Sequence, residues 1–284
     1  MLATIAGNGL VRNVQLAEYG HQAQGITPGG PADELAFLIA YILLGRPQIY
    51  QALEIVFAPR EIIFASDTLF CLSGAGFPSS KLVRDKQSLA IEHGVVSFAN
   101  AGDKLLLSGI RGGLRSYLLM VAASTDNLGV VGRYRGDLRQ WFNPYSRQIQ
   151  VVAGPEFDFL LNPEQLLNPS WQIDKRSNVM GMRLTGTEIL LSSYDIISAP
   201  VCDGTVQITA AGPIILMRER QTIGGYPRVL TVCHESLNHL AQLASGESIT
   251  FELIDHAKAI RWQSEYFHKL QMYEKFIASG QTRS

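Results

Sequence analysis

The sequence contains 284 residues, of which 46% are hydrophobic and 17% are charged. This length is enough for one large domain or two ordinary domains with substantial cores. Lys and Arg total 24 against 25 Asp and Glu, so the net charge is −1, and bulk electrostatic attraction to nucleic acid or to an anionic membrane is not expected.

The three cysteines are widely spaced in apolar runs, and the six histidines are scattered. No Cys/His spacing typical of metal ligands occurs, so we predict no metal site and core thiols in a reducing compartment. The first residues lack the basic segment and long apolar run of a signal peptide. The longest apolar run, residues 35–44, has about half the length of a membrane span. We therefore predict a cytoplasmic protein.

The clearest predicted helix spans residues 31–45. Pro31 is expected at its first position, Asp33 and Glu34 in its first turn, and Gly45 at its end. Between these signals, apolar residues recur at the spacing of one helical face. This segment interrupts a sequence that otherwise reads as strands.

Between residues 52 and 121, short apolar segments alternate with Gly, Pro, Asn or Asp. Their spacing of about ten residues is typical of a sandwich or barrel and not of β-α-β units. Residues 124–147 are polar and rich in Gly, which predicts a long connection between domains. The predicted strands of this half are 9–15, 53–57, 61–64, 68–72, 82–83, 89–91, 95–98, 104–108 and 115–121.

A second set of strands follows this connection. The C-terminal segment has Tyr266, Leu270, Tyr273 and Ile277 at positions i, i+4, i+7 and i+11, which predicts a helix with one apolar stripe. That stripe either packs on the body of the protein or docks a partner. The predicted strands are 148–153, 171–173, 181–184, 206–208, 214–216, 229–232 and 248–254, and the predicted short helices are 160–171 and 235–245.

These elements predict a mainly β protein with a few helices. An N-terminal barrel-like domain is expected over residues 1–147 and includes the helix 31–45. A C-terminal β domain is expected over residues 148–257, and a final helix over residues 258–284.

The first polar cluster that is able to carry chemistry is residues 175–184. Arg183 stands between Met182 and Leu184, so on a strand its side chain points to the opposite face. It is either an edge arginine in solvent or a guanidinium group placed for a carboxylate or phosphate.

The second cluster is residues 202–207. Asp203 and Gly204 form an ordinary turn signal, and a turn alone would explain both. Gln207 follows on the predicted strand, where its amide offers both donors and an acceptor to an amide-like substrate.

The third cluster follows the apolar run 214–217. Glu219 is a candidate general base, Arg220 a candidate for charge stabilisation, and the amides of Gly224 and Gly225 are candidate oxyanion donors. The alternative is a strand that leaves the core and turns at the surface. The common nucleophile and nucleotide-binding motifs are absent.

Four motifs occur in one order in the C-terminal half. They are Ser177-Asn178-x-Met180-Gly181-x-Arg183-Leu184-x-Gly186, Gly204-Thr205-Val206-Gln207, Gly212-Pro213 and Gln221-Thr222-x-Gly224-Gly225-Tyr226-Pro227. In this order they resemble the biotin-dependent carboxyltransferase family, and the last motif is the most specific. The similarity runs over nearly the whole chain. The family includes the KipA-like C subunit of the bacterial 5-oxoprolinase and the second part of allophanate hydrolase or urea amidolyase.

The resemblance implies two linked cyclophilin-like β-barrel domains. It also implies a heteromeric complex with the KipI-like B subunit and the A subunit of 5-oxoprolinase, which opens 5-oxo-L-proline to L-glutamate with ATP as co-substrate. Activation of the stable lactam by phosphorylation needs cationic and N–H donors. The implied catalytic residues are Arg183, Glu219 and Arg220, and the implied substrate-binding residues are Asn178, Gln207, Gln221, Thr222, Gly224, Gly225 and Tyr226.

The N-terminal block departs from the family pattern. The family usually reads VQDxGR, whereas here Val14-Gln15 is followed by Leu16-Ala17-Glu18-Tyr19, without the Asp and Arg. A non-catalytic KipA-like regulator that binds a KipI-like protein therefore remains an alternative. A urea carboxylase or allophanate hydrolase-type module that uses biotin is a further alternative, although the sequence contains no biotin-attachment domain.

Overall fold

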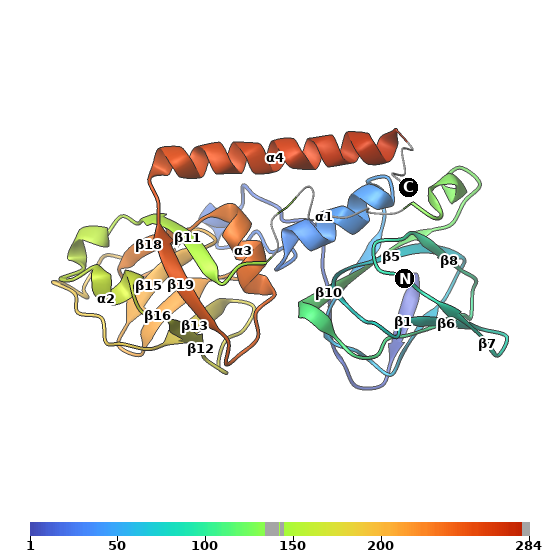
Figure 1. The fold of residues 1–284 in the computed structure, drawn as a ribbon, viewed down its shortest axis with the longest axis horizontal. Coiled ribbons are helices and arrows are strands. Elements are labelled where there is room, and N and C mark those ends of the chain that lie inside the picture. Colours follow the sequence, from blue (N-terminus) through green and yellow to red (C-terminus); the bar gives the residue numbers. More distant parts are fainter. Residues whose placement is uncertain (134–141, 143–144, 280–284) are drawn as a thin grey trace. The chain divides into compact units, whose positions relative to one another are not determined.

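The computed structural model describes residues 1–133, 142 and 145–279 (Figure 1). Of the predicted connection 124–147, residues 134–141 and 143–144 lie outside this part. The chain forms two compact units. The first comprises Met1–Gln15, Asp33–Phe142 and Lys269–Ser284, and the second comprises Leu16–Ala32 and Asn143–His268. The domain boundaries at 147 and 257 remain a prediction, and the segment Leu16–Ala32, which we call the 16–32 loop, groups with the second unit.

The first unit contains two antiparallel five-stranded sheets. One has the order β1 (Ala3–Ala6), β4 (Glu61–Phe64), β9 (Lys104–Leu106), β6 (Lys81–Arg84) and β7 (Gln87–Ala90). The other has the order β2 (Leu10–Asn13), β3 (Gln51–Phe57), β10 (Arg111–Ala122), β5 (Thr68–Gly76) and β8 (Ser97–Ala99).

One hydrophobic core joins the two sheets of this unit. It contains Ile62 and Leu105 from the first sheet and Ile55, Phe70 and Leu118 from the second. A barrel-like domain was predicted for this half, and its strands form two sheets that share a core. The mainly β character is confirmed, and β1 is a strand that the sequence pattern did not predict.

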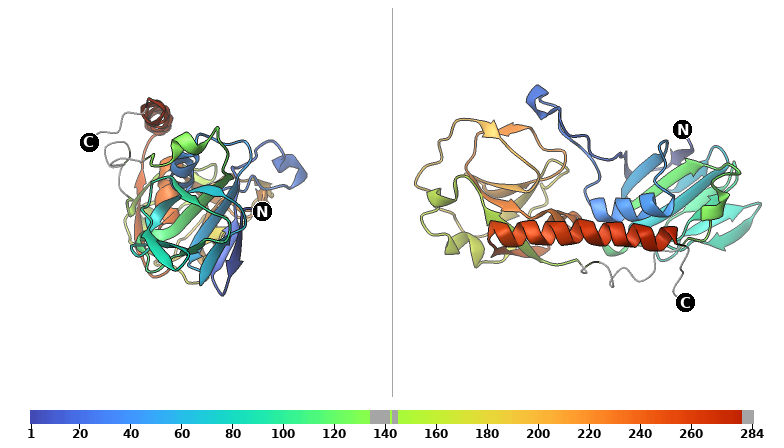
Figure 2. Two further views of the ribbon diagram at one scale, coloured as in Figure 1. Left: turned by 90° about the vertical axis from the view of Figure 1, so that its right-hand side faces the viewer. Right: turned by 90° about the horizontal axis from the view of Figure 1, so that it is seen from above.

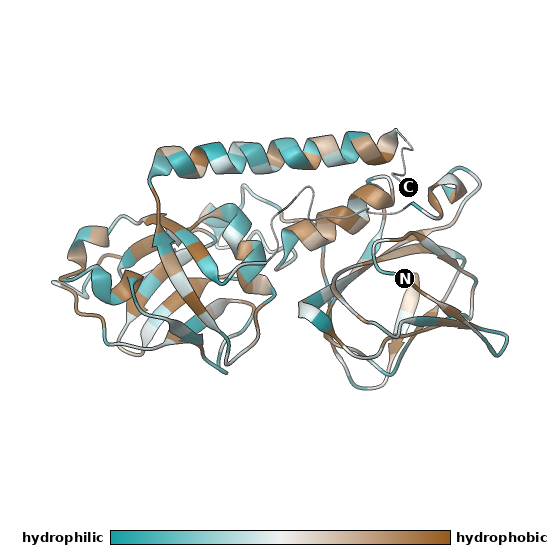
Figure 3. Ribbon diagram, in the orientation of Figure 1, coloured by the Kyte–Doolittle hydropathy of each residue, from teal (hydrophilic) through white to brown (hydrophobic). Residues whose placement is uncertain are grey.

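Helix α1 (Glu34–Leu43) starts three residues later than expected. Asp33 is its N-cap and accepts a hydrogen bond from Ala36 N at 3.0 Å, so Pro31 precedes the helix. Gly45, with φ of 80°, follows its C-terminal end. Figure 3 shows α1 as brown over most of its surface, which agrees with burial of eight of its residues.

The second unit contains a closed barrel of seven strands (Figure 1). Its strands in spatial order are β11 (Gln148–Ala153), β18 (Arg228–Val232), β15 (Thr205–Thr209), β16 (Gly212–Leu216), β13 (Gly181–Thr185), β12 (Trp171–Ile173) and β19 (Ser248–Leu253). A parallel pairing of β11 with β19 closes the ring. The core inside it includes Trp171, Val206, Ile215 and Leu230. The predicted barrel of this half is confirmed.

Three helices follow strands of the barrel in the sequence. The segment predicted as helix 160–171 contains only α2 (Glu164–Leu167), with the 3-10 turn η4 (Phe157–Phe159) before it. Helix α3 (His234–Ala241) lies within the expected region, and α4 (His256–Ala278) is the C-terminal helix. No helix in the described part of the chain is both long enough and apolar enough to span a membrane.

The apolar stripe of α4 is buried. Tyr266, Leu270, Tyr273 and Ile277 are between 0% and 8% exposed. Tyr266 packs on His234 in the second unit, with ring centroids 5.5 Å apart, and Tyr273 packs on Phe142 in the first unit. Packing on the protein itself, the first of the two predicted roles, is therefore the one observed.

Candidate functional site

A lateral row of side chains crosses the outer face of the barrel. Arg183 of β13 is paired with Ile214 of β16, and Ile214 is in turn paired with Gln207 of β15. Side chains alternate along a strand, and the neighbours Met182 and Leu184 are in the barrel core. Arg183 therefore faces outward, as predicted. With strands about 4.8 Å apart, Arg183 and Gln207 lie about 10 Å apart in one row.

The two glycines of the QTxGGYP motif lie over Gln207. The short strands β14 (Ala199–Pro200) and β17 (Ile223–Gly224) pair to form a ribbon, which we call the β14–β17 ribbon. Gln207 is only 2% exposed, and its Nε2 donates to the carbonyl of Tyr226 at 2.9 Å. A Cβ atom on Gly224 would lie 2.6 Å from this Nε2, so only glycine fits there without a shift. Tyr226 itself is 51% exposed.

An ion pair fixes one side of the β14–β17 ribbon. Arg228 of β18 holds Glu156 through two hydrogen bonds, Nε–Oε2 at 2.8 Å and Nη2–Oε1 at 2.6 Å. Its Nη1 donates to the carbonyl of Pro200 at 2.8 Å. The side-chain hydrogen bond to Arg228 lowers the pKa of Glu156 below its ordinary value, and the pKa of Arg228 is raised. Arg228 thus ties the ribbon to the barrel.

A buried charged cluster lies where β16 ends and β15 begins. Asp203 accepts from Arg218 through Oδ2 at 3.3 Å, and its Oδ1 lies 3.2 Å from Arg220 Nε. Both arginine side chains are only 3% exposed. Nη1 of Arg220 is buried without a hydrogen-bond partner in the described part of the chain. Two guanidinium groups thus share the carboxylate of Asp203 in this Arg218–Asp203–Arg220 cluster.

The 16–32 loop lies on this cluster. Tyr19 donates its hydroxyl hydrogen to Asp203 Oδ2 at 3.3 Å and accepts from Arg218 Nη1 at 3.4 Å. Thr27 Oγ1 donates to the carbonyl of Arg218 at 3.1 Å. A Cβ atom on Gly29 would lie 3.8 Å from Glu219 Oε1, so the loop passes beside that carboxylate. The part of the sequence that departs from the family pattern therefore contacts the candidate site.

The 16–32 loop is closed by its own backbone. Glu18 N donates to the carbonyl of Pro28 at 3.0 Å, so the two ends of the loop lie next to each other. The 3-10 turn η1 (Gln22–Gln24) lies at its tip, drawn in dark blue in the right-hand view of Figure 2. Gly30 has φ of 104°, in the region that favours glycine.

Asn178 and Glu219 lie on adjacent segments at the same end of the barrel. Oδ1 of Asn178 accepts from Met180 N at 2.9 Å and from Gly181 N at 3.2 Å, so the side chain stabilises its own turn. Glu219 N donates to the carbonyl of Val179 at 3.2 Å. Asn178 is exposed and Glu219 is half-buried.

The other reactive residue types do not join this site. Cys71 is buried, Cys233 is half-buried and Cys202 is exposed, so the expectation of three core thiols is wrong for Cys202. Burial raises the pKa of the Cys233 thiol to about 11, which removes the thiolate needed for nucleophilic attack. Within the described ranges, no three His, Cys, Asp or Glu side chains gather in a way that would hold a metal ion.

The structure groups the predicted residues in two places on one barrel. The outer-face group contains Arg183, Gln207, Gly224, Gly225 and Tyr226, and the end group contains Asn178, Glu219 and Arg220. Asn178 N donates to the carbonyl of Gly181 at 3.1 Å, two residues before Arg183 on β13, so the two groups lie on neighbouring segments. Gln221 is exposed between them, and the carbonyl of Thr222 accepts from Val201 N at 3.0 Å.

Three residues of the end group were not among the predicted site residues. Asp203 reads as an ordinary turn residue, Arg218 as one member of a polar run, and Tyr19 is 184 residues away from Asp203 in the sequence. The three consecutive charged residues 218–220 are the one feature of the local sequence that indicates this cluster. The Asp203 and Tyr19 contacts depend on tertiary structure and have no signature in a single sequence.

Comparison with known proteins places this barrel in a family. The family model described as "Carboxyltransferase domain, subdomain A and B" matches residues 24–126 and 134–253. The chain belongs to the carboxyltransferase domain family. Both matched segments together cover most of the chain, and the second includes all ten predicted site residues.

Within the carboxyltransferase domain family, two bacterial relatives match almost from end to end. The 5-oxoprolinase C subunit of Escherichia coli (strain K12) is 30% identical, with 89% of this chain and 92% of the relative aligned. The protein of the same name from Haemophilus influenzae (strain ATCC 51907 / DSM 11121 / KW20 / Rd) is 28% identical, with 87% and 89% aligned.

A solved structure of this family shares the fold. The K. lactis urea amidolyase superposes with a TM-score of 0.81 over 96% of this chain and 20% of that chain, at 17% identity. At this identity the likeness shows the carboxyltransferase-domain fold alone.

Proposed function

We propose that this chain is the C subunit of an ATP-dependent 5-oxoprolinase that acts together with the A and B subunits. The two bacterial relatives carry that name, and each aligns over nearly its whole length with this chain. Alignment over both full lengths supports a shared role of the whole polypeptide and not of a single module. In this proposal ATP is the co-substrate of the complex.

The observation that carries the proposal is the Arg218–Asp203–Arg220 cluster. Both arginine side chains are buried, and Arg220 Nη1 has no hydrogen-bond partner among the described side chains and backbone groups. A buried guanidinium N–H group that lacks an acceptor is costly, and an anionic ligand would supply that acceptor. 5-Oxoproline supplies one carboxylate, and phosphorylation of its lactam oxygen adds further negative charge. A guanidinium group matches either anion.

The proposed reaction begins with transfer of the γ-phosphoryl group of ATP to the lactam oxygen, which releases ADP. Water then adds to the activated carbon, the ring C–N bond breaks, and the nitrogen takes up a proton. A second water cleaves the resulting acyl phosphate to glutamate and inorganic phosphate. Arg220 and Arg183 would stabilise the developing negative charge, and Glu219 would take a proton from the attacking water.

The remaining residues of the proposed site would orient the ring. The Gly224 and Gly225 amides and the exposed Tyr226 lie on the turn that Gln207 holds in place. Asn178 belongs to the end group, and Gln221 and Thr222 lie in the sequence between Arg220 of the end group and Gly224 of the outer-face group. In this proposal Gln207 acts mainly through the turn, because its NH₂ group already bonds the Tyr226 carbonyl.

The test is co-expression of this chain with the candidate A and B subunits, followed by measurement of ATP-dependent glutamate release from 5-oxoproline. We expect Arg220→Gln to lower kcat by about 100-fold or more, as for loss of a charge-stabilising donor. The matched control is Arg176→Gln, because Arg176 is exposed and pairs locally with Asp174. We expect that control to keep wild-type turnover.

Two results would contradict different parts of the proposal. Wild-type turnover in an intact complex with Arg220→Gln would remove the cluster from the site, and the same result with Arg183→Ala would remove Arg183. Absence of glutamate release from a complex that assembles with both partners would overturn the assignment to an enzyme.

A second candidate function is a non-catalytic regulator that binds a KipI-like protein. The observation that favours it is that Tyr19 forms hydrogen bonds with Asp203 and Arg218. Tyr19 belongs to the N-terminal block in which the family usually carries Asp and Arg. Stable association with the KipI-like partner alone, together with a change in that partner's activity and no glutamate release, would support this candidate. The urea-directed alternative with biotin has weaker support, from relatives of lower identity and from the shared fold.

A further inference from the structure

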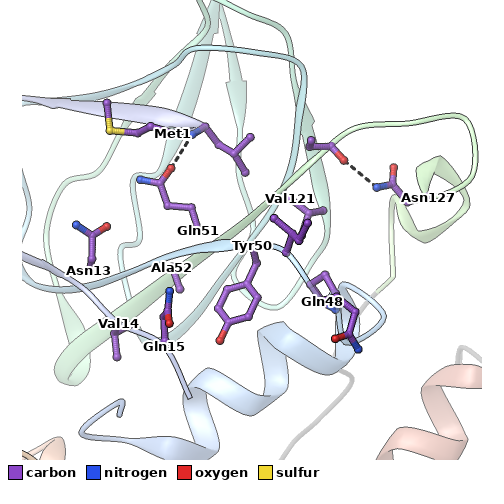
Figure 4. A pocket seen from close by; sticks show the side chains of 14 residues that line it. Met1, Asn13, Val14, Gln15, Gln48, Tyr50, Gln51, Ala52, Val121 and Asn127 are labelled. Atoms are coloured by element: carbon purple, nitrogen blue, oxygen red, sulfur yellow. Dashed lines mark hydrogen bonds between the residues drawn. The ribbon is translucent and has the colours of Figure 1, made fainter. Parts of the chain in front are cut away.

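A cavity of about 750 Å³ lies in the first unit, at the start of β3 (Figure 4). All of its lining residues belong to that unit, so it is separate from the barrel site proposed above. Its volume falls within the range of cavities that bind small molecules. None of the motifs described for the C-terminal half contributes a residue to this cavity.

The lining of this cavity is mainly apolar, and its polar side chains are uncharged. Its polar side chains are mainly carboxamides, from Asn13, Gln15, Gln48, Gln51 and Asn127, and none of the 14 lining residues is Asp, Glu, Lys, Arg or His. Charged residues make up 17% of the chain, so about two would be expected among fourteen by composition alone. The side chains of the cavity thus offer hydrogen-bonding groups without charge, and the one charged group among the lining residues is the α-amino group of Met1.

The backbone register brings three of these carboxamides together. Asn13 is paired with Leu53, and Val14 N donates to the carbonyl of Ala52 at 3.0 Å. Asn13 and Gln15 therefore flank the first residues of β3, where Gln51 lies. Figure 4 shows this arrangement, with Gln48 on the other side of the Tyr50 ring.

The hydrogen bonds already present decide which groups are available to a ligand. Oε1 of Gln51 accepts from Leu2 N at 2.7 Å and from Ala3 N at 3.3 Å, which leaves its NH₂ group as the available end. The side chains of Asn13, Gln15 and Gln48 are exposed, and across the described residues none of the three makes a side-chain hydrogen bond. A ligand would break no internal hydrogen bond of the protein to engage them.

Asn127 differs from the other carboxamides. Its NH₂ group donates to the carbonyl of Ala122 at 2.8 Å, and its Oδ1 accepts from Ser124 N at 2.8 Å. Both ends are therefore used to hold the turn after β10. Asn127 forms part of the wall and is not a ligand-binding group.

The rest of the lining is mainly apolar; Met1 and Ile49 are 88% and 89% exposed, whereas other members are buried. Val14, Ala52 and Val121 are between 3% and 5% exposed. The Tyr50 ring packs against Tyr41 of α1, with centroids 5.4 Å apart, and against Phe37 at 6.1 Å. Such a surface suits a flat or compact apolar group next to the carboxamides.

We propose that this cavity binds an uncharged small molecule that carries an amide group on an apolar body. An amide presents a carbonyl acceptor and an N–H donor, and a protein carboxamide offers the complementary pair. A carboxylate of the same shape finds no cationic side chain in the lining and would lose hydration without compensation. The site is therefore selective for the neutral form.

The experiment uses two probes of matched shape, 3-phenylpropanamide and 3-phenylpropanoate, with the full-length protein. Ligand-observed NMR and isothermal titration should detect the amide, with the carboxylate at least about tenfold weaker. Gln15→Leu and Gln48→Leu should each weaken amide binding by about three- to tenfold, the value of one net hydrogen bond. Both side chains are exposed, so neither variant threatens folding.

The matched control is Gln87→Leu, an exposed glutamine of β7 that does not line the cavity. It should leave amide binding unchanged, as should Arg220→Gln, because Arg220 belongs to the barrel site. Equal affinity for the two probes, binding that resists both cavity substitutions, or no binding of the amide at millimolar concentration would each overturn the proposal. None of these results depends on 5-oxoprolinase activity.

Discussion

The side-chain amide of Gln207 donates to the backbone carbonyl of Tyr226 at 2.9 Å, across 19 residues of sequence. This bond joins two motifs, the strand β15 and the turn of the QTxGGYP sequence, into one structural unit. Because Gln207 is buried, the bond is shielded from water. The exposed turn therefore has a rigid support on the barrel.

Replacement of Gln207 by Leu should loosen this turn. The Tyr226 carbonyl would lose its partner in a buried setting, at a cost of about 1–3 kcal/mol. We expect lower kcat/KM in the reconstituted complex and faster amide hydrogen exchange at residues 224–227. Gln148→Leu, an exposed glutamine of β11, should change neither quantity. Unchanged exchange in Gln207→Leu would show that the bond does not hold the turn.

The two adjacent glycines of the motif should respond differently to alanine. A Cβ atom on Gly224 would lie 2.6 Å from Gln207 Nε2, whereas one on Gly225 would lie 3.3 Å from Ser198 Oγ. Gly224→Ala should therefore destabilise the protein by about 1–3 kcal/mol through overpacking, and Gly225→Ala by less. Urea unfolding of both variants measures the difference. Equal effects would mean that the Gln207 side chain moves aside freely.

Asp203→Asn should destabilise the barrel because it leaves two buried guanidinium groups without their carboxylate. Loss of one partner of a buried ion pair costs about 3–5 kcal/mol, and Arg218 and Arg220 are each only 3% exposed. Chemical denaturation at pH 7 gives the free energy of unfolding. The matched control is Asp126→Asn, at an exposed aspartate of the turn after β10, which should have little effect on stability. A stable Asp203→Asn protein would instead indicate that the cluster is hydrated.

The buried His239 of α3 should make stability fall in acid. Burial lowers its pKa to about 4 from an ordinary value of 6.5. Between these two pH values the unfolded chain binds a proton that the folded chain does not, so stability decreases as pH falls from 6.5 towards 4. Above that range both states are neutral and the group contributes no pH dependence.

His239→Gln tests this prediction through the difference between two pH profiles. Carboxylates titrate in both proteins and cancel in the comparison. We expect the wild type to lose about 2–3 kcal/mol more than the variant between pH 7 and pH 4.5. Parallel profiles would show that folding does not lower the pKa of His239.

Much of the fold could be predicted because its signals are local. The strands 61–64, 148–153 and 171–173 were predicted with the bounds of β4, β11 and β12. The start of α1 was misplaced because Pro31 is a good first-turn residue, yet Asp33 captures the Ala36 amide and begins the helix later. The short β1, β14 and β17 depend on partners elsewhere in the chain, which a local pattern does not reveal.

The candidate site was predictable to a smaller extent. The family resemblance is confirmed, and Arg220 was predicted from a dense run of polar residues after a buried strand. Asp203 could not be distinguished from a turn residue, because its two arginine partners lie 15 and more residues away. Tyr19 lies in the block that had lost the family's Asp and Arg, and only the folded chain shows that this block reaches the barrel.

The grouping of the 16–32 loop with the second unit has a consequence for biosynthesis. This segment is among the first to be made, yet the barrel residues that it contacts, Asp203 and Arg218, follow more than 180 residues later. The first unit similarly receives residues 269–284 at the very end. The second unit therefore has all its residues only once residue 268 has been added, and the first only after residues 269–284 follow. No single cut would yield two halves that each retain all of their native segments.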